Sequence, residues 1–507
     1  MTIFSSLVVL FVLVGTSFAA ISLRGQGEPP PVFEVEEVVE GDPSRFAVAD
    51  FNKGRYLGAV LRARPLADTG NPFALLVMGL AYESGKGIDQ SHELALVNYR
   101  KAVEAGNQEA PYRLAHLLIS LGGEKNQKEA RLVLEGLAEK EGGEAAWRLG
   151  EGYLKGWFGG ESDFAKARSW WEKAAEKGNV TAMISLARLL DGEFGFSDQR
   201  DVSGALKQYV SAAELGFGPA MTRAGSRLLN GDEKTRDEEK GRKWLARAIE
   251  SKQWDAYFVL GDYAEKATKS DETAYAEYLK GAEAGHGQCM LKVASFIMEG
   301  RGGQEKKPEN ALAWFKKAGS AGQVLGHVQA AQILLNGEGL KIVEGYNHLL
   351  AAAESGLVDM QNELGVLYLS GRLGVRDATA AASWFRRSAS GKYPAGAFNL
   401  ATLFEQGLGV PQNFDQAGQL YTMAANAGHA KSTTALGRFH AEGRATKQNL
   451  PRAWALFALA LERGDTQAEG FKEKVGELLD EEGKEAASNI LAEYQKGPSS
   501  PKDETGK

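Results

Sequence analysis

Small residues recur along this chain with a regular period. One column of Ala and Gly returns at steps of 33 to 38 residues, and each member opens a segment whose apolar positions follow helical spacing. Eleven residues after the members of this column, nine of the twelve positions hold Gly. The column consists of Ala59, Ala95, Ala130, Ala167, Ala205, Gly241, Ala274, Ala311, Gly345, Ala381, Ala417 and Ala453.

A second column of small residues lies between the members of the first. It begins with a mostly small residue, and the position five residues later is Gly or Ala in all eleven copies. The residue just before that position is always apolar, as at Leu149 and Leu400. Each half-repeat thus carries small or apolar residues at i, i+4, i+7 and i+8, which is one face of a helix.

The two columns together predict a repeating helix–turn–helix pair. Small residues let two helices approach closely, and large residues such as Trp171 and Tyr421 fill the grooves that remain. The closing Gly supplies the left-handed backbone that ends the second helix. One pair cannot bury its own apolar faces, so we expect stacked pairs to share a continuous core.

This pattern resembles the Sel-1-like repeat family, a relative of the tetratricopeptide repeat. The likeness is closest in residues 145–178 and 400–428, is weaker where Glu141 and Lys252 replace the closing Gly, and covers residues 46–464. It implies an all-α fold, a right-handed α-solenoid of about twelve helix–turn–helix repeats. Family members are mostly adaptors that present an extended surface to proteins or polymers. Residues 465–496 break the columns, and we expect them to form capping helices.

The two ends of the chain differ from the repeats in composition. Residues 3–22 carry no charge and end in small residues, which predicts a signal peptide over residues 1–20 or, if it is retained, an N-terminal membrane anchor. Residues 21–45 form an acidic, Pro-containing linker, and residues 497–507 are a polar tail that we expect to be disordered. Either reading of the first segment predicts an exported protein, periplasmic or secreted.

Composition and motifs exclude several kinds of chemistry. The 507 residues carry 59 Lys and Arg against 66 Asp and Glu, so the net charge of −7 argues against nucleic-acid binding. A lone Cys289 excludes an internal disulfide and a cysteine-built zinc site. No catalytic or metal-binding motif occurs among the histidines, and we interpret His286 and His429 as turn residues because each follows a closing Gly. We therefore predict no enzyme activity, no cofactor and no metal.

Basic residues mark one position of the first helices. The position three residues after the small starter holds Arg or Lys in four of eleven repeats, and one further Arg lies a turn away. In tetratricopeptide geometry the first helix lines the concave side, so these residues predict a basic stripe for an acidic peptide or an anionic glycan. The alternative is a solvated helix face with scattered charge. The five residues are Arg113, Arg148, Arg188, Arg223 and Lys292.

Tryptophans occupy the same place in four alternate second helices, namely Trp170, Trp244, Trp314 and Trp384. One interpretation is an aromatic ladder for a sugar polymer. The interpretation we favour is packing against the neighbouring pair, because aromatic side chains dominate helix contacts.

The sequence thus predicts an exported repeat scaffold that mediates protein–protein or protein–polymer interactions through a concave helical surface. One alternative is a membrane-anchored envelope or polysaccharide-assembly subunit, which would retain residues 1–20. A second alternative is a cell-wall-directed hydrolase, which would need a compact cluster of titratable residues that the sequence does not reveal.

Overall fold

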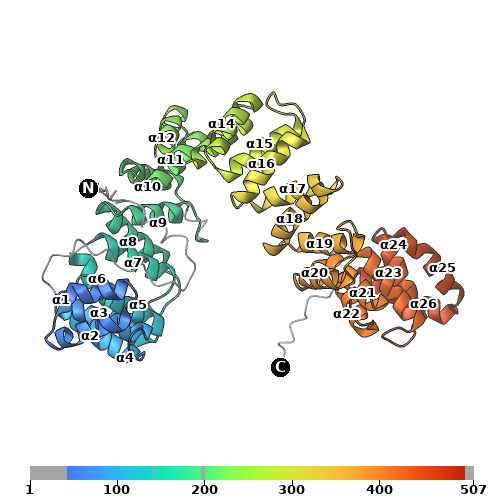
Figure 1. Cartoon of the computed structure of the whole chain (residues 1–507), viewed down its shortest axis with the longest axis horizontal. Helices are drawn as coiled ribbons and strands as arrows, with labels where there is room; N and C mark the ends of the chain where they lie inside the picture. Colours follow the sequence, from blue (N-terminus) through green and yellow to red (C-terminus); the bar gives the residue numbers. More distant parts are fainter. Residues whose placement is uncertain (1–42, 141, 196–199, 497–507) are drawn as a thin grey trace, which may run out of the picture. The chain divides into compact units, whose positions relative to one another are not determined.

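The described part of the protein is entirely helical. The computed structural model describes residues 43–140, 142–195 and 200–496, and within these ranges it contains 26 α-helices and no strand (Figure 1). The segments 1–20 and 497–507 lie outside the described residues, as does most of the predicted linker. The first described helix begins at Pro43, inside the span predicted as linker.

Helices α1 to α24 follow one another as twelve pairs, which confirms the predicted α-solenoid of helix–turn–helix repeats. The first helices of the pairs are α1 (Pro43–Asn52), α3 (Pro72–Ser84), α5 (Ala110–Leu121), α7 (Gly143–Leu154), α9 (Val180–Leu190), α11 (Gly218–Asn230), α13 (Asp255–Lys266), α15 (Gly287–Glu299), α17 (Val324–Leu335), α19 (Val358–Ser370), α21 (Pro394–Gln406) and α23 (Ala430–Glu442).

Most of the second helices end two residues before the predicted closing Gly. They are α2 (Tyr56–Asp68), α4 (His92–Glu104), α6 (Glu124–Lys140), α8 (Phe164–Glu176), α10 (Val202–Glu214), α12 (Glu238–Glu250), α14 (Asp271–Glu283), α16 (Pro308–Ser320), α18 (Leu340–Glu354), α20 (Ala378–Ser390), α22 (Phe414–Asn426) and α24 (Leu450–Glu462). After them come a short 3₁₀ helix (Thr466–Ala468), α25 (Glu469–Glu477) and α26 (Glu481–Gln495).

The chain divides into two compact units, which we describe separately. Unit 1 ends at Ala220 and holds α1 to α10, and unit 2 begins at Met221 and holds α12 to α26 with most of α11. In unit 1 the helices of a pair pack together, as do α8 and α9, which belong to successive pairs. The same order holds in unit 2, where α13 packs on α14 and α14 on α15.

The small-residue columns lie where helices touch most closely. In α7 a Cβ placed on Gly150 would lie 2.3 Å from Nε1 of Trp171 on α8, whose side chain is fully buried. In α19 the same addition to Gly365 would lie 2.5 Å from the ring of Phe385 on α20. Only glycine fits against these large side chains, which explains why the column excludes larger residues.

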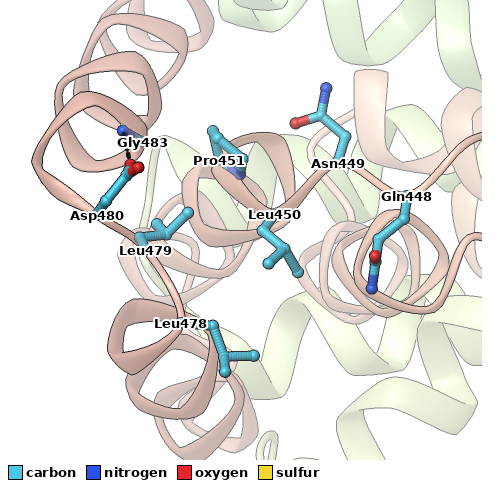
Figure 2. Close-up of a pocket in the computed structure, with 8 residues that line it drawn as sticks. All are labelled: Gln448, Asn449, Leu450, Pro451, Leu478, Leu479, Asp480 and Gly483. Carbon is cyan, nitrogen blue, oxygen red and sulfur yellow. Dashed lines mark hydrogen bonds between the residues drawn. The ribbon is translucent and has the colours of Figure 1, made fainter.

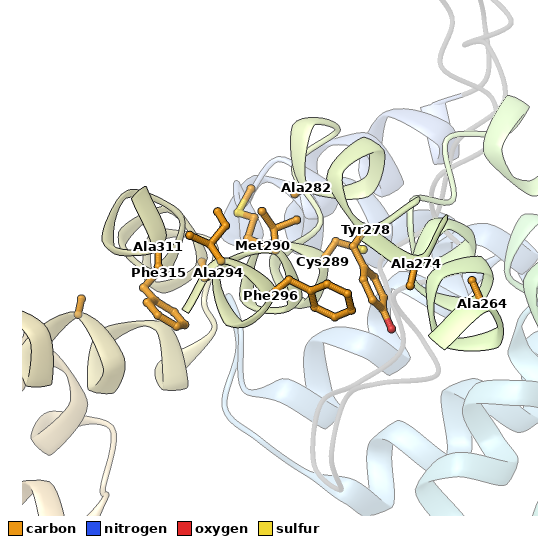
Figure 3. Packing of buried hydrophobic residues seen from close by; sticks show 14 residues of the cluster. Ala264, Ala274, Tyr278, Ala282, Cys289, Met290, Ala294, Phe296, Ala311 and Phe315 are labelled. Atoms are coloured by element: carbon orange, nitrogen blue, oxygen red, sulfur yellow. The ribbon is translucent and has the colours of Figure 1, made fainter. Parts of the chain in front are cut away.

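The core runs from one pair into the next. One buried cluster in unit 2 takes Ala264 from α13, Tyr278 from α14, Cys289 from α15 and Phe315 from α16 (Figure 3). Side chains of successive pairs are therefore buried against one another, as the stacking argument predicts.

The closing glycines adopt the left-handed backbone that their position requires. Gly178 and Gly428, for example, have φ values of 80° and 88°. Where Lys252 replaces this Gly, the residue still has a φ of 59°, so the repeat keeps its turn at the cost of some backbone strain. Among the described helices, none has the length and apolar content needed to cross a membrane.

Candidate interaction surface

The five basic residues of the predicted stripe all lie on first helices. Arg113, Arg148 and Arg188 lie on α5, α7 and α9 of unit 1, whereas Arg223 and Lys292 lie on α11 and α15 of unit 2. First helices also pack directly on one another within a unit, as α7 does on α9 and α13 on α15. In each unit, some neighbouring first helices therefore share part of one face.

Arg113 does not contribute to the surface of this face. The residue is only 6% exposed, and its Nε donates a hydrogen bond of 3.2 Å to Glu109 one turn earlier. Burial raises the pKa of Glu109, and the Arg113 charge opposes that effect. The role of Arg113 is thus to balance a half-buried carboxylate inside the fold.

Arg148 belongs to a contact between neighbouring first helices. Its guanidinium lies 5.3 Å from the ring centre of Tyr112 on the preceding first helix, and its Nη2 lies 2.9 Å from Glu144. The same register recurs between α7 and α9, where Nε1 of Trp147 donates to Oγ of Ser185 at 3.1 Å. The stripe column is therefore also a packing column, a role that the charge pattern alone did not reveal.

Arg188 and Arg223 lie closer to solvent. Nε of Arg188 is 2.7 Å from Glu193, and its guanidinium lies over the ring of Phe194 at 5.0 Å. Arg223 is exposed. The side chains of Arg148, Arg188 and Lys292 keep 33%, 39% and 31% of their surface exposed, so these paired cations still face solvent.

Lys292 is part of a carboxylate-centred cluster between two repeats. Oε2 of Glu265 on α13 accepts hydrogen bonds from Lys292 Nζ at 2.8 Å and from Tyr278 Oη at 2.9 Å, while Oε1 accepts from Arg301 at 3.1 Å. Burial acts to raise the pKa of Glu265, but these hydrogen bonds and charges bring it below its ordinary value. Glu265 therefore stays ionised and joins its own repeat to the next.

Similar clusters, which we call carboxylate nodes, occur at Glu83 and Glu405. Glu405 accepts from Tyr421 at 2.7 Å, from Arg438 at 3.2 Å and from Arg444 at 3.1 Å. Glu83 accepts from Tyr99, and Nδ1 of His116 lies 4.0 Å away.

The nodes have a sequence signal that the predictions from charge spacing do not include. Each Glu lies nine residues after a first-helix starter, and each Tyr lies four residues after a member of the Ala column. Burial and the neighbouring carboxylate raise the pKa of Tyr99 and Tyr278, which keeps their hydroxyls protonated as donors.

The tryptophans pack as expected rather than lining an open surface. Trp170, Trp314 and Trp384 are half-buried, and each lies against a buried cluster of its own unit. A cation three residues later covers each ring, as Lys173 covers Trp170 at 4.2 Å and Arg387 covers Trp384 at 4.5 Å.

The lone cysteine has a histidine beside it but lacks the environment of a nucleophile. Sγ of Cys289 lies 3.1 Å from Nδ1 of His286, and the residue is fully buried. Burial raises the pKa of Cys289 to about 12, so the thiol stays protonated. His286 itself caps α15 by accepting a hydrogen bond from the Cys289 backbone, a role consistent with its interpretation as a turn residue.

Two further histidines meet although they are far apart in sequence. Nδ1 of His327 on α17 lies 2.8 Å from Nδ1 of His348 on α18. No motif spacing signals this pair, because only the packing of the two helices brings the rings together. Within the described ranges, no group of three or more His, Cys, Asp or Glu residues has the geometry to hold a metal ion.

A hollow of about 490 Å³ lies between the start of α24 and the turn that joins α25 to α26 (Figure 2). The side chains of Asn449 and Asp480 in its lining already accept hydrogen bonds from the helices that they cap. The lining offers no paired acid and base. It consists of Gln448, Asn449, Leu450, Pro451, Leu478, Leu479, Asp480 and Gly483.

These features define a helical-repeat protein whose units present faces for contact with other molecules. The family model described as Sel1 repeat matches seven segments that together make up about half of the chain, namely residues 72–107, 143–179, 218–252, 287–323, 358–393, 394–429 and 430–465. The chain belongs to the Sel1 repeat family.

Two curated fungal relatives share the repeat region. Chitin synthase regulatory factor 3 of Schizosaccharomyces pombe is 26% identical over 289 residues, which cover 54% of this chain and 30% of that protein. Chitin synthase regulator SKT5 of Saccharomyces cerevisiae is 24% identical over 270 residues, which cover 50% of this chain and 38% of that protein. The matched region thus spans about a third of the length of these relatives.

Solved structures of similar proteins include two with the same repeat. The antigen c5321 of uropathogenic Escherichia coli, which displays an SLR fold, is 22% identical with a TM-score of 0.45, covering 89% of this chain and 92% of that chain. A Sel1 repeat protein from Oxalobacter formigenes is 22% identical with a TM-score of 0.36, covering 71% and 93%.

Proposed function

We propose that this protein is an exported, non-enzymatic scaffold that binds a protein partner through its first-helix faces. The observation that carries the proposal is the direct packing of neighbouring first helices in both units, as α7 packs on α9 and α13 on α15, which places their side chains on a shared face. Family membership supports a scaffold role, because helical repeats stacked in this way create extended binding surfaces.

The proposed partner presents acidic side chains to this face. Arg148 and Arg188 each bond a partly exposed carboxylate of the chain while remaining partly exposed themselves. Exposed ion pairs contribute only about 0–1 kcal/mol each, so an acidic partner can replace the internal carboxylate at small cost. Arg113 and Lys292 are left out of this proposal, because Arg113 is buried and Lys292 bonds the nearly buried Glu265.

Charge reversal on the first helices tests the proposal. We expect Arg148→Glu together with Arg223→Glu to abolish partner capture from the native cell extract. The matched control is Lys173→Glu with Arg247→Glu, which reverses exposed cations over Trp170 and Trp244 on second helices. Unchanged capture by the first variant, or equal loss in both, would reject the first-helix face.

A second candidate function is regulation of a polysaccharide-synthesising enzyme, with residues 1–20 retained as an anchor. It is favoured by the names of the two fungal relatives, both of which are described as regulating chitin synthase. N-terminal sequencing of the mature protein separates the candidates. Loss of residues 1–20 supports the exported scaffold, and their retention supports the anchored regulator.

A further inference from the structure

Two histidines in unit 2 act as helix caps and must be neutral to do so. Nδ1 of His286 accepts the backbone N–H of Cys289 at the start of α15, at 3.4 Å. Nδ1 of His429 accepts the backbone N–H of Ser432 at the start of α23, at 3.3 Å, and lies 2.8 Å from the Ser432 hydroxyl. A protonated imidazole has no acceptor nitrogen, so the cap is lost when the ring gains a proton.

The surroundings of both caps oppose the charged ring. The positive end of the helix dipole lies at the capped terminus and disfavours a cation there. Burial lowers the pKa of His286, although Asp255 on α13 acts in the opposite direction. Burial and Lys431 lower the pKa of His429, while Asp465 acts to raise it.

The His327–His348 pair adds a third site, which requires at least one neutral imidazole. Two Nδ1 atoms 2.8 Å apart share one hydrogen, so one ring donates and the other accepts. If both rings are protonated, two positive charges face each other across the contact between α17 and α18. Lys316 of α16 and Glu344 of α18, which pair with each other, are the charged groups beside His348. Burial lowers the pKa of His348, and the like charge of His327 lowers it further.

Unit 1 uses a different residue at the same cap position. The residue after the closing Gly is Asn71, Asn107 or Asn179 in three of its repeats, and each side-chain oxygen accepts a backbone N–H of the following helix. An amide does not titrate, so these caps are the same at pH 7 and pH 5.

We propose that unit 2 is an acid-responsive element, in which protonation of His286, His429 and the His327–His348 pair loosens α15, α23 and the α17–α18 contact. The direction of the pH effect on folding stability follows from proton linkage. Histidine in the unfolded chain has a pKa of about 6.5, and in the fold His286, His348 and His429 have lower pKa values. The unfolded chain therefore binds more protons in acid. The stability that the neutral rings provide is complete above about pH 6.5 and is lost as the pH falls toward the folded pKa values.

The test uses substitutions that the chain already employs at the same columns. The variant is full-length protein carrying His286→Asn, His429→Asn and His348→Gln. Asn is the residue that Asn179 supplies at the cap position of another repeat, and Gln is the residue that Gln208 supplies at the position of His348. Urea unfolding is followed at pH 7.5 and pH 5.0. Between pH 7.5 and pH 5.0, we expect the urea midpoint of unit 2 to fall in the wild type by on the order of 0.5 M more than it falls in the triple variant. His92→Asn, at an exposed histidine of unit 1, is expected to keep the wild-type dependence. An unchanged pH dependence in the triple variant overturns the proposal.

If the triple variant does not fold, the histidine pKa values of the unsubstituted protein provide a second test. Full-length protein labelled only at histidine is titrated by NMR, with single variants used for assignment. We expect His286, His348 and His429 to gain their protons at lower pH than histidine in the urea-unfolded chain. Titration of all three at or above the pH of the unfolded chain overturns the proposal.

Discussion

Unit 1 and unit 2 are built on the same small-residue columns but differ in their helix caps and in the polar contacts between helices. In both units a glycine of a first helix faces a large buried side chain, as Gly150 faces Trp171 and Gly365 faces Phe385. The caps differ, because unit 1 uses asparagine where unit 2 has His286 and His429. Close packing therefore dictates residue size, whereas a cap can be made by any suitable acceptor. The two units can share a fold and still respond differently to their surroundings.

The carboxylate nodes differ between the units in the same way. In unit 1 Nδ1 of His116 lies 4.0 Å from Glu83, and in unit 2 Glu405 bonds both Arg438 and Arg444. An arginine is charged at every physiological pH, and a histidine is not. Burial lowers the pKa of His116, so this partner of Glu83 carries less positive charge at neutral pH than an arginine does.

The largest expected effect comes from breaking the packing rule that both units share. Gly150→Ala forces a methyl group against Trp171 and disturbs its hydrogen bond to the Trp147 carbonyl. Gly365→Ala forces a methyl group against the ring of Phe385. Each change should lower the free energy of unfolding by about 2–3 kcal/mol, as measured by urea denaturation.

Matched controls place alanine where the helix has room. Gly136 in α6 and Gly470 in α25 are exposed, and a Cβ on either meets no atom within 4 Å. Gly136→Ala and Gly470→Ala should therefore raise stability by about 0.5–1 kcal/mol. If all four variants change stability by similar amounts, the packing account of the glycine column is wrong.

A smaller effect is expected at the carboxylate nodes. Glu405 is almost buried, and Glu405→Gln leaves Arg438 and Arg444 without their shared negative charge. We expect a loss of about 1–2 kcal/mol, reduced from the value for a fully buried pair because both arginines are partly exposed. Glu83→Gln should lose less than about 1 kcal/mol, because burial lowers the pKa of the His116 that pairs with it and keeps this histidine largely neutral. Thermal unfolding at pH 7 compares the two, and an equal or larger loss for Glu83→Gln contradicts this reading of the nodes.

The smallest change moves a histidine cap into unit 1. Asn179→His should leave the free energy of unfolding nearly unchanged at pH 7.5, because a neutral imidazole can accept from Ala182 as His286 does from Cys289. At pH 5 the variant should be about 0.5–1 kcal/mol less stable than the wild type, since the protonated ring no longer caps α9. Urea midpoints at the two pH values measure the difference, and a pH-independent effect would show that caps are not the source of acid sensitivity.

The fold could be predicted almost completely from the sequence, whereas the polar contacts between helices could not. Backbone conformation and packing follow local rules, so the closing Gly178 and the small Ala167 identify their positions by residue type and spacing alone. The twelve pairs follow from those columns. The partners of a charged side chain depend on which repeat lies beside it, and a count of charges does not contain that information.

The predicted basic stripe illustrates this limit. Spacing correctly placed Arg113 and Lys292 on first helices, but it did not show that Glu109 and Glu265 lie within hydrogen-bonding distance of them. Similarly, His327 and His348 are 21 residues apart, and only the α17–α18 contact brings their rings together. Whether the stripe binds a partner stays a prediction.

Hydrogen exchange of the wild-type chain at pH 7.0 and pH 5.0, corrected for intrinsic exchange rates, tests the central comparison most directly. Because the two units share one repeat architecture but differ in their helix caps, we predict that backbone amides lose protection from exchange in acid at the starts of α15 and α23 and across the α17–α18 contact. The starts of α5 and α9, which are capped by Asn107 and Asn179, should keep their protection. An equal loss at the asparagine-capped and histidine-capped helices would contradict the account.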